Sequence, residues 1–273
     1  MKRIDRLIAI TEILLSHPNQ LFPLGVFADR FQSAKSTISE DLIMIKDKLL
    51  LSNRGFLETV PGAAGGVKYL PSISVEEASS FLEKLAQTLN ASERILPGGF
   101  IYMADLLYDP RIVRTLGLIF ASIFRSRKPE AVVTIETKGI PLALMTADSL
   151  GIPAVVIRHG NKVTEGSSVS INYISGSSKR IQTMSLARRA LDSGKKVLII
   201  DDFIKAGGTA KGIISLMHEF DAEVVGLGIL VEDVLWKESR LVNDYLSLLE
   251  YGDPSTDQPV IKAKTQVLSQ IGV

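Results

Sequence analysis

The sequence predicts an α/β protein with two domains, a small helical head followed by a larger domain built around a parallel sheet. Two patterns support this fold class. The first 71 residues contain three segments with helical spacing of apolar residues, then two segments in which apolar and polar residues alternate. From residue 131 onward, short apolar runs alternate with helical stretches, which is typical of parallel strands joined by crossover helices. A chain of 273 residues is long enough for two such domains.

The head is assigned to residues 1–73 and the larger domain to residues 74–273, with a short linker at 71–74. The predicted elements of the head are three helices and a β-hairpin, over residues 4–16, 24–31, 35–51, 55–60 and 66–70. The turn of the hairpin is rich in Gly and Ala, which allows close backbone approach. Three helices followed by a hairpin form the winged helix–turn–helix pattern.

The third helix of the head has two different faces. Ile38, Leu42, Ile45 and Leu49 recur at helical spacing and predict one buried stripe. Polar residues gather near the N-terminus of the same helix, which in this pattern enters the major groove of DNA. The residues predicted to contact DNA, through side chains or through the wing backbone, are Arg3, Arg6, Lys35, Ser36, Thr37, Ser39, Gly62, Gly65, Gly66 and Lys68.

Other interpretations of the head stay open. The first 73 residues carry nine Lys/Arg and seven Asp/Glu, and this small excess is weak evidence for nucleic acid by itself. Each Lys or Ser, taken singly, fits a solvated surface somewhat better than a DNA contact. The head as a whole is also compatible with a protein–protein interaction domain.

Composition excludes several kinds of site. The chain has no Cys, so it has no disulfide and no thiolate nucleophile or metal ligand. His17, His159 and His218 lie far apart and lack metal-ligand spacing, so no metal site is predicted. No apolar run is long enough to predict a membrane-spanning helix. Asp5 and Glu12 interrupt the apolar N-terminal segment, which therefore predicts a folded helix rather than a signal peptide, and we expect a cytoplasmic protein.

The larger domain begins with two acidic amphipathic segments, at residues 75–89 and 100–107. The predicted strands of its sheet follow at residues 131–135, 154–157, 197–200 and 224–231, with helical stretches at 140–150 and 209–220.

The most informative segment of this domain follows the apolar run at 197–200. Asp201 and Asp202 lie at the carboxyl end of that predicted strand, and a Gly-Gly-Thr turn at 207–209 then opens a helix. Ligands of open α/β sheets bind at the carboxyl ends of strands, and a helix N-terminus favours a phosphate. Neighbouring carboxylates suit the vicinal hydroxyls of a ribose. The segment therefore predicts a pocket for a phosphorylated pentose.

The alternative for this segment is an ordinary strand that ends in two exposed acids before a helix cap. A Gly-Gly-Thr turn alone would favour that interpretation, whereas its combination with a buried strand and an acid pair favours the sugar phosphate. Neither a Walker loop nor the dinucleotide-binding Gly-x-Gly-x-x-Gly pattern is present.

Residues 197–210 resemble the phosphoribosyl diphosphate signature of type I phosphoribosyltransferases. The resemblance implies that Asp201 and Asp202 bind the ribose hydroxyls and that residues 206–210 bind the 5-phosphate. Ala206 stands where the enzymes often have Thr, which removes one hydroxyl contact. The same resemblance implies a fold of the type I phosphoribosyltransferase kind for the larger domain.

Two further segments fit this resemblance. Residues 137–139 follow a predicted strand as the pyrophosphate loop does, and residues 158–180 resemble the flexible loop that covers the diphosphate, although a solvated hairpin is the alternative. Three aromatic side chains could stack on a base but could equally be core residues. The predicted effector contacts are Asp201, Asp202, Phe203, Lys205, Ala206, Gly207, Gly208, Thr209, Ala210, Thr137, Lys138, Gly139, Arg158, Lys162, Phe100 and Tyr102.

Three motifs in order, at residues 33–42, 60–67 and 197–210, resemble the purine operon repressors of low-GC Gram-positive bacteria. The resemblance implies a homodimer that binds double-stranded operator DNA, represses purine biosynthesis and transport genes, and senses phosphoribosyl diphosphate without transferase use. It implies no prosthetic group, although Mg²⁺ can arrive with the diphosphate. Related ribose phosphates and guanosine alarmones are further candidates for the same pocket.

A catalytically active purine phosphoribosyltransferase with an accessory DNA-binding domain is the alternative function. We predict no catalytic residues and no enzyme, because no separate base-binding hood is identifiable in the sequence. Residual transferase activity, in a protein with both functions, stays open. The sequence specifies neither the operator nor the route that couples effector binding to DNA binding.

Overall fold

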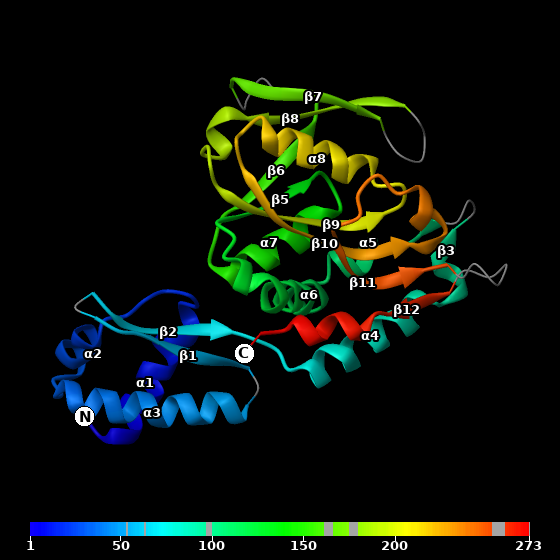
Figure 1. Cartoon of the computed structure of the whole chain (residues 1–273). Coiled ribbons are helices and arrows are strands. Elements are labelled where there is room, and N and C mark those ends of the chain that lie inside the picture. Colours follow the sequence, from blue (N-terminus) through cyan, green and yellow to red (C-terminus); the bar gives the residue numbers. More distant parts are fainter. Residues whose placement is uncertain are drawn as a thin grey trace. The chain divides into compact units, whose positions relative to one another are not determined.

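A computed structural model describes residues 1–52, 54–62, 64–96, 100–160, 166–174, 180–252 and 260–272 (Figure 1). The described chain forms two compact units. The first contains Met1–Ser74, and the second contains Val75–Asp148 and Ile152–Gly272.

The first unit consists of three helices and a two-stranded antiparallel sheet. Its elements are α1 (Arg3–Ser16), α2 (Leu24–Phe31), α3 (Lys35–Leu51), β1 (Gly55–Val60) and β2 (Gly66–Pro71). The two strands pair from Gly55 with Pro71 to Val60 with Gly66. This arrangement confirms the winged helix–turn–helix fold predicted from the apolar spacing.

The core of the first unit lies between the three helices and the hairpin. Ile10 and Leu14 of α1, Phe27 of α2 and Ile38 of α3 are fully buried. The ring of Phe27 lies 5.6 Å from that of Phe22, measured between centroids. Each such side chain stabilises the fold by about 1.5–3 kcal/mol through its removal from water. The packing fixes α3 by its apolar stripe and leaves its N-terminal polar residues outside the core.

The second unit begins with several helices and a short hairpin. These are α4 (Val75–Leu89), η1 (Ser92–Arg94), β3 (Ile95–Leu96), β4 (Phe100–Ile101), α5 (Ala104–Leu107) and α6 (Pro110–Phe124). Helix α6 was not predicted from the sequence. Its start nevertheless carries a local signal, because the side chain of Asp109 accepts a hydrogen bond from the N–H of Arg111 at 2.9 Å and Pro110 occupies the first turn.

The second unit is built on an eight-stranded sheet with the order β12-β11-β10-β9-β5-β6-β8-β7. Its strands are β5 (Ala131–Ile135), β6 (Ala154–His159), β7 (Ser168–Ile174), β8 (Ile181–Ala187), β9 (Lys196–Ile204), β10 (Glu223–Asp233), β11 (Leu246–Tyr251) and β12 (Ile261–Ala263). The central strands β11, β10, β9, β5 and β6 pair in parallel, and β12, β8 and β7 add antiparallel pairs at the edges. The mostly parallel sheet confirms the predicted α/β class.

Two of the described α-helices follow parallel strands of the sheet. They are α7 (Gly139–Leu150) after β5 and α8 (Gly208–His218) after β9, so both begin at the carboxyl end of a central strand. The remaining short helices are η2 (Arg125–Arg127), η4 (Arg188–Ala190), η5 (Val234–Ser239) and η6 (Thr265–Gln270). None of the described helices is both long and apolar enough to cross a membrane.

Helices cover both faces of the sheet (Figure 1). On one face, Val197 and Ile199 of β9 belong to a core cluster that also contains buried side chains of α8. On the opposite face, β10 has Gly226 and Gly228, where a Cβ atom would lie 2.7 Å from the ring of Phe124 and 2.9 Å from that of Phe120. The rings of α6 therefore occupy the space that side chains of β10 would need.

Candidate functional site

A cavity of about 260 Å³ lies at the carboxyl end of β9, where the chain turns into α8. The residues predicted as effector contacts that line it are Phe100, Lys138, Asp201, Asp202, Phe203, Lys205, Ala206, Gly207, Gly208, Thr209 and Ala210. Four further apolar residues that were not predicted from the sequence complete the lining: Ile101, Met103, Ile204 and Ile229. The alternation of apolar Ile101 and Met103 after Phe100 is the signal that could have identified two of these four.

The fold removes the carboxyl groups of the acid pair from much of their water. Asp201 is buried and Asp202 is half-buried, and the N–H of Asp202 donates to Oδ1 of Asp201 at 3.0 Å. Burial and the neighbouring charge of Asp202 raise the pKa of Asp201 well above its ordinary value. Burial also raises the pKa of Asp202, although the nearby Lys138 opposes that shift. A ligand that donates hydroxyl protons to these oxygens would replace the missing water.

The turn between β9 and α8 presents backbone N–H groups at the cavity. Gly207 has a φ of 76°, in the left-handed region that favours glycine. Since α8 begins at Gly208, the N–H groups of Gly208, Thr209 and Ala210 have no acceptor within the helix. The helix dipole adds positive potential at the same place. Small side chains and free donors together suit a phosphate group.

The loop at residues 137–139 packs directly against the acid pair. A Cβ atom at Gly139 would lie 2.4 Å from Oγ1 of Thr134 and 3.0 Å from Oδ1 of Asp201, so glycine permits this close approach. Lys138 lines the same cavity, and α7 begins at Gly139. The cavity therefore combines Lys138, the residue directly before α7, with the N-terminus of α8, and both favour an anion.

Arg158 forms an ion pair with Glu136. Its Nη1 donates to Oε2 of Glu136 at 3.1 Å, and the N–H of His159 donates to Oε1 of Glu136 at 2.5 Å. Burial would raise the pKa of Glu136, but these two donors outweigh it and hold the pKa below its ordinary value. Arg158 does not line the cavity, so it would have to leave Glu136 to meet a ligand there. Lys162, the other cation predicted in this segment, lies outside the described residues.

Of the two aromatic residues around β4, only Phe100 lines the cavity. The Nζ of Lys205 lies 4.6 Å from the centroid of the Phe100 ring, a cation–π contact across the cavity lining. Tyr102 instead lies 5.9 Å from the guanidinium of Arg94, which also pairs with Asp105 at 2.7 Å. Of the loop at 137–139, Thr137 and Gly139 are not part of the lining.

The head presents the start of α3 to solvent. Lys35, Ser36 and Ser39 are exposed, and Thr37 is half-buried. Ala34 caps α3 without a side-chain hydrogen bond, so the first N–H groups of the helix stay available to an acceptor such as a DNA phosphate. Three further residues predicted to contact DNA lie in the wing. Gly62 is exposed, and Gly65 and Lys68 are half-buried. The Nζ of Lys68 pairs with Glu58 at 2.8 Å.

The prediction of a surface role is corrected for Arg6 and Gly66. Arg6 is buried, and its Nε donates to the buried carboxylate of Asp41 at 2.5 Å, so it joins α1 to α3. Arg3 reaches the same carboxylate at 3.1 Å but stays half-exposed. Gly66 is buried, and it packs so closely against the backbone of Phe22 that a Cβ atom there would lie 2.3 Å from the carbonyl oxygen of Phe22.

Metal ligands do not gather in the part of the chain that the structure describes. No group of three or more His, Asp and Glu side chains is placed to hold a metal ion among these residues. The acid pair offers at most two carboxyl groups at the cavity.

Comparison with known proteins assigns both units. Residues 2–71 match the family model described as the N-terminal domain of the bacterial purine repressor, and residues 103–249 match the phosphoribosyl transferase domain. The purine biosynthesis transcriptional repressor PurR of Bacillus subtilis is 53% identical over 248 residues, which cover 91% of this chain and 87% of that protein. This chain belongs to the bacterial purine repressor family. The membership confirms the resemblance found in the three sequence motifs.

One relative is named as an activator, whereas the Bacillus subtilis relative is named as a repressor. The purine biosynthesis transcriptional activator PurR of Lactococcus lactis is 42% identical over 250 residues, with 92% of each chain covered.

A crystal structure of adenine phosphoribosyltransferase from Rhodothermus marinus aligns with a TM-score of 0.54 and 24% identity, covering 63% of this chain and 99% of that one. At this identity the similarity shows the fold, and it confirms a phosphoribosyltransferase-like second unit.

Proposed function

We propose that this member of the purine repressor family is a DNA-binding repressor of purine biosynthesis and transport genes, and that phosphoribosyl diphosphate controls its DNA affinity. The observation that supports the effector is the cavity that joins Asp201, Asp202, Lys138 and the N-terminus of α8. The head supports DNA as the partner, and the name of the Bacillus subtilis relative supports repression of purine genes.

The proposed effector matches the cavity group by group. Its ribose hydroxyls donate to the carboxyl oxygens of Asp201 and Asp202, and its 5-phosphate accepts from the N–H groups of residues 206–210. Its diphosphate lies toward Lys138 and the start of α7. Mg²⁺ enters bound mainly to the diphosphate, because the acid pair alone offers too few ligands for a protein-bound ion. Guanosine alarmones carry the same combination of ribose and phosphates and are alternative effectors.

DNA is proposed to contact the exposed start of α3 and the wing. Lys35, Ser36, Thr37 and Ser39 meet phosphates and base edges, while Gly62, Gly65, Lys68 and Arg3 meet the DNA backbone. We propose a homodimer, because a two-fold symmetric protein matches paired half-sites.

Coupling between the two sites requires that the effector bind the free and the DNA-bound protein with different affinities. The simplest proposed route is electrostatic, because an anionic effector repels DNA or competes with it for cationic surface. A DNA-shift assay with increasing phosphoribosyl diphosphate and Mg²⁺ should show operator affinity falling at least tenfold at saturation. An unchanged operator affinity, with calorimetry showing the ligand bound, would contradict the coupling.

Two variants separate effector binding from DNA binding. The double variant Asp201→Asn, Asp202→Asn should keep its operator affinity and lose the response to phosphoribosyl diphosphate. Lys35→Ala should weaken operator binding and keep the calorimetric signal with phosphoribosyl diphosphate. Loss of both functions in the acid variant would indicate misfolding, and absence of any heat with the unmodified protein would exclude this effector.

A catalytically active purine phosphoribosyltransferase is the second candidate. The transferase domain match and the two aromatic rings at the cavity, Phe100 and Phe203, favour it because either ring could stack on a base. Incubation with labelled phosphoribosyl diphosphate, Mg²⁺ and each purine base distinguishes the candidates. Turnover on the order of 1 s⁻¹ or faster would favour the enzyme, and slower turnover together with effector-controlled DNA binding would indicate a protein with both functions.

A further inference from the structure

The proposed phosphate-binding turn, residues 205–208 between β9 and α8, has few side chains that could hold its backbone in place. Ala206, Gly207 and Gly208 have no side chain that can donate or accept a hydrogen bond. Small residues let an anion approach the backbone, but the same feature leaves the orientation of each peptide group unsupported. If a carbonyl oxygen rather than an N–H turned toward the ligand, it would repel a phosphate. The turn therefore needs support from another part of the chain.

The segment after η5 supplies this support. The Nε of Arg240 donates to the carbonyl oxygen of Lys205 at 2.8 Å, and the N–H of Leu241 donates to that of Ala206 at 2.9 Å. A Cβ atom at Gly207 would lie 3.0 Å from Cγ2 of Val242. Two consecutive carbonyl groups of the turn are thus engaged by residues 240–241.

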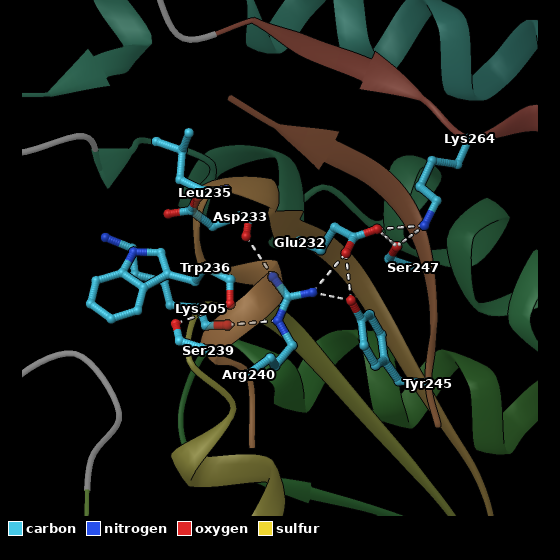
Figure 2. A network of polar contacts seen from close by, with 10 residues as sticks. All are labelled: Lys205, Glu232, Asp233, Leu235, Trp236, Ser239, Arg240, Tyr245, Ser247 and Lys264. Atoms are coloured by element: carbon cyan, nitrogen blue, oxygen red, sulfur yellow. Dashed lines mark hydrogen bonds and ion pairs between the residues drawn. The ribbon is translucent and has the colours of Figure 1, made fainter. Parts of the chain in front are cut away.

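Arg240 is itself held firmly. It is buried, its Nη1 donates to Oε2 of Glu232 at 2.8 Å and to the hydroxyl of Tyr245, and its Nη2 donates to the carbonyl oxygen of Asp233 (Figure 2). Figure 2 shows the guanidinium between Glu232 and the backbone of Lys205. A planar guanidinium can direct several donors at once, which a lysine cannot do.

Glu232 connects Arg240 to β11 and to the residue that follows β12. Besides Arg240, it accepts hydrogen bonds from Tyr245, from Ser247 at 2.7 Å and from the Nζ of Lys264 (Figure 2). Glu232 therefore has two cationic partners. Arg240 also contacts the phosphate-binding turn, and Lys264 lies beyond Glu232, next to Ser247.

We propose that Arg240 is a positioning residue for the effector's 5-phosphate. It fixes the carbonyl groups of the turn away from the ligand, and the N–H groups at the start of α8 consequently face it. The proposal rests on the proposed function, since it concerns how that phosphate is held. Arg240 does not touch the ligand itself. It would change the affinity for the phosphate by fixing the direction of the backbone N–H groups that bind it.

The test compares Arg240→Met with Lys264→Met in the full chain. Each variant removes one cation from Glu232, but only the first removes a contact with the turn. Three quantities are measured: the melting temperature, the hydrogen exchange of residues 205–210 without ligand, and the calorimetric Kd of phosphoribosyl diphosphate with Mg²⁺. A third variant, Leu241→Pro, removes the N–H that meets Ala206 and spares the buried charges; Arg240 has a ψ of 136°, which a following proline accepts.

We expect Arg240→Met to raise the Kd at least tenfold and to accelerate exchange in the turn, while Lys264→Met changes neither by more than twofold. Leu241→Pro should act in the same direction as Arg240→Met, and it decides the question should the arginine variant fail to fold. The inference is wrong if the exchange of the turn is unaffected in the variants at residues 240 and 241, or if Lys264→Met raises the Kd as much. Exchange requires no ligand, so an unmodified protein that binds no phosphoribosyl diphosphate would contradict the proposed function while the exchange comparison still tests the positioning.

Discussion

Two buried carboxyl groups of the second unit have pKa values shifted in opposite directions. Burial alone would raise the pKa of Glu232, but hydrogen bonds from Lys264, Tyr245 and Ser247 lower it to about 2. Burial and the charge of the neighbouring acid raise that of Asp201. Ionised Glu232 therefore stabilises the fold, whereas ionised Asp201 destabilises it.

Replacing Glu232 by Gln should lower the free energy of unfolding by about 3 kcal/mol at neutral pH, because it leaves the buried Arg240 and the half-buried Lys264 without a charged partner. The contribution of Glu232 is fully present above its ordinary pKa of 4.5 and is lost as the pH falls toward about 2. Urea unfolding of both proteins at about pH 7 and about pH 3 measures the difference. An equal loss at the two pH values would show that the ionisation of Glu232 is not its cause.

Asp201→Asn should have the opposite effect on stability. A carboxyl group with a raised pKa contributes stability below its ordinary pKa of 3.8, and that contribution is lost as the pH rises through the folded-state value. The amide keeps an oxygen for the N–H of Asp202, so the variant should gain roughly 1 kcal/mol at about pH 8 and little at about pH 4. Thermal unfolding at both pH values tests this, and a variant that is less stable at the higher pH would contradict it.

Elements with a local pattern could be predicted from the sequence, and long-range contacts could not. The stripe of α3 and the apolar start of β9 each fall within one short segment, so their burial and the ends of α3 follow from spacing. The strand β9 itself continues to Ile204, four residues beyond its predicted end. Arg6 with Asp41, and Arg240 with Lys205, are each 35 residues apart. No spacing rule joins such pairs. For this reason Arg6, predicted to contact DNA, is in fact buried, and the contact of Arg240 with the turn between β9 and α8 was not predicted.

The packing of α6 against β10 gives a prediction at the scale of elements. Gly228→Ala should destabilise the second unit by about 1–3 kcal/mol, because its Cβ would lie 2.7 Å from Cδ1 of Ile200 and 2.9 Å from the ring of Phe120. Gly25→Ala adds the same methyl group to α2, where the nearest atom is 3.9 Å away, and should be neutral or slightly stabilising. Chemical unfolding of both variants provides the comparison, and equal stabilities would show that the sheet accommodates the methyl group.

For the whole molecule, the proposed binding of DNA and of an effector would belong to one chain with a net charge of only +1. Attraction to DNA must therefore come from the local arrangement of charge in the head, not from an excess of positive charge over the molecule. Because the coupling is thermodynamically reciprocal, the factor by which phosphoribosyl diphosphate lowers operator affinity should equal the factor by which operator DNA lowers effector affinity.

Lys35→Ala should reduce the slope of log operator affinity against log salt by about 1, because one phosphate contact is lost. Lys195→Ala is the matched control, since it removes the same charge from the second unit, where Lys195 pairs with Glu130 at 2.9 Å. Fluorescence anisotropy with labelled operator at several salt concentrations measures both slopes. A reduced slope in the Lys195 variant alone would indicate that DNA contacts the second unit and not the head.

The only tryptophan of the chain, Trp236, lies in η5, four residues before Arg240, and its carbonyl oxygen accepts a hydrogen bond from Ser239 at 3.3 Å (Figure 2). The protein thus contains a natural optical probe in the segment whose residues 240 and 241 contact the turn between β9 and α8. Indole emission excited at its red edge arises from this one place. Should binding at the cavity change the surroundings of Trp236, rapid-mixing measurements would time the arrival of a small molecule without an attached dye, and would do so in the presence of DNA.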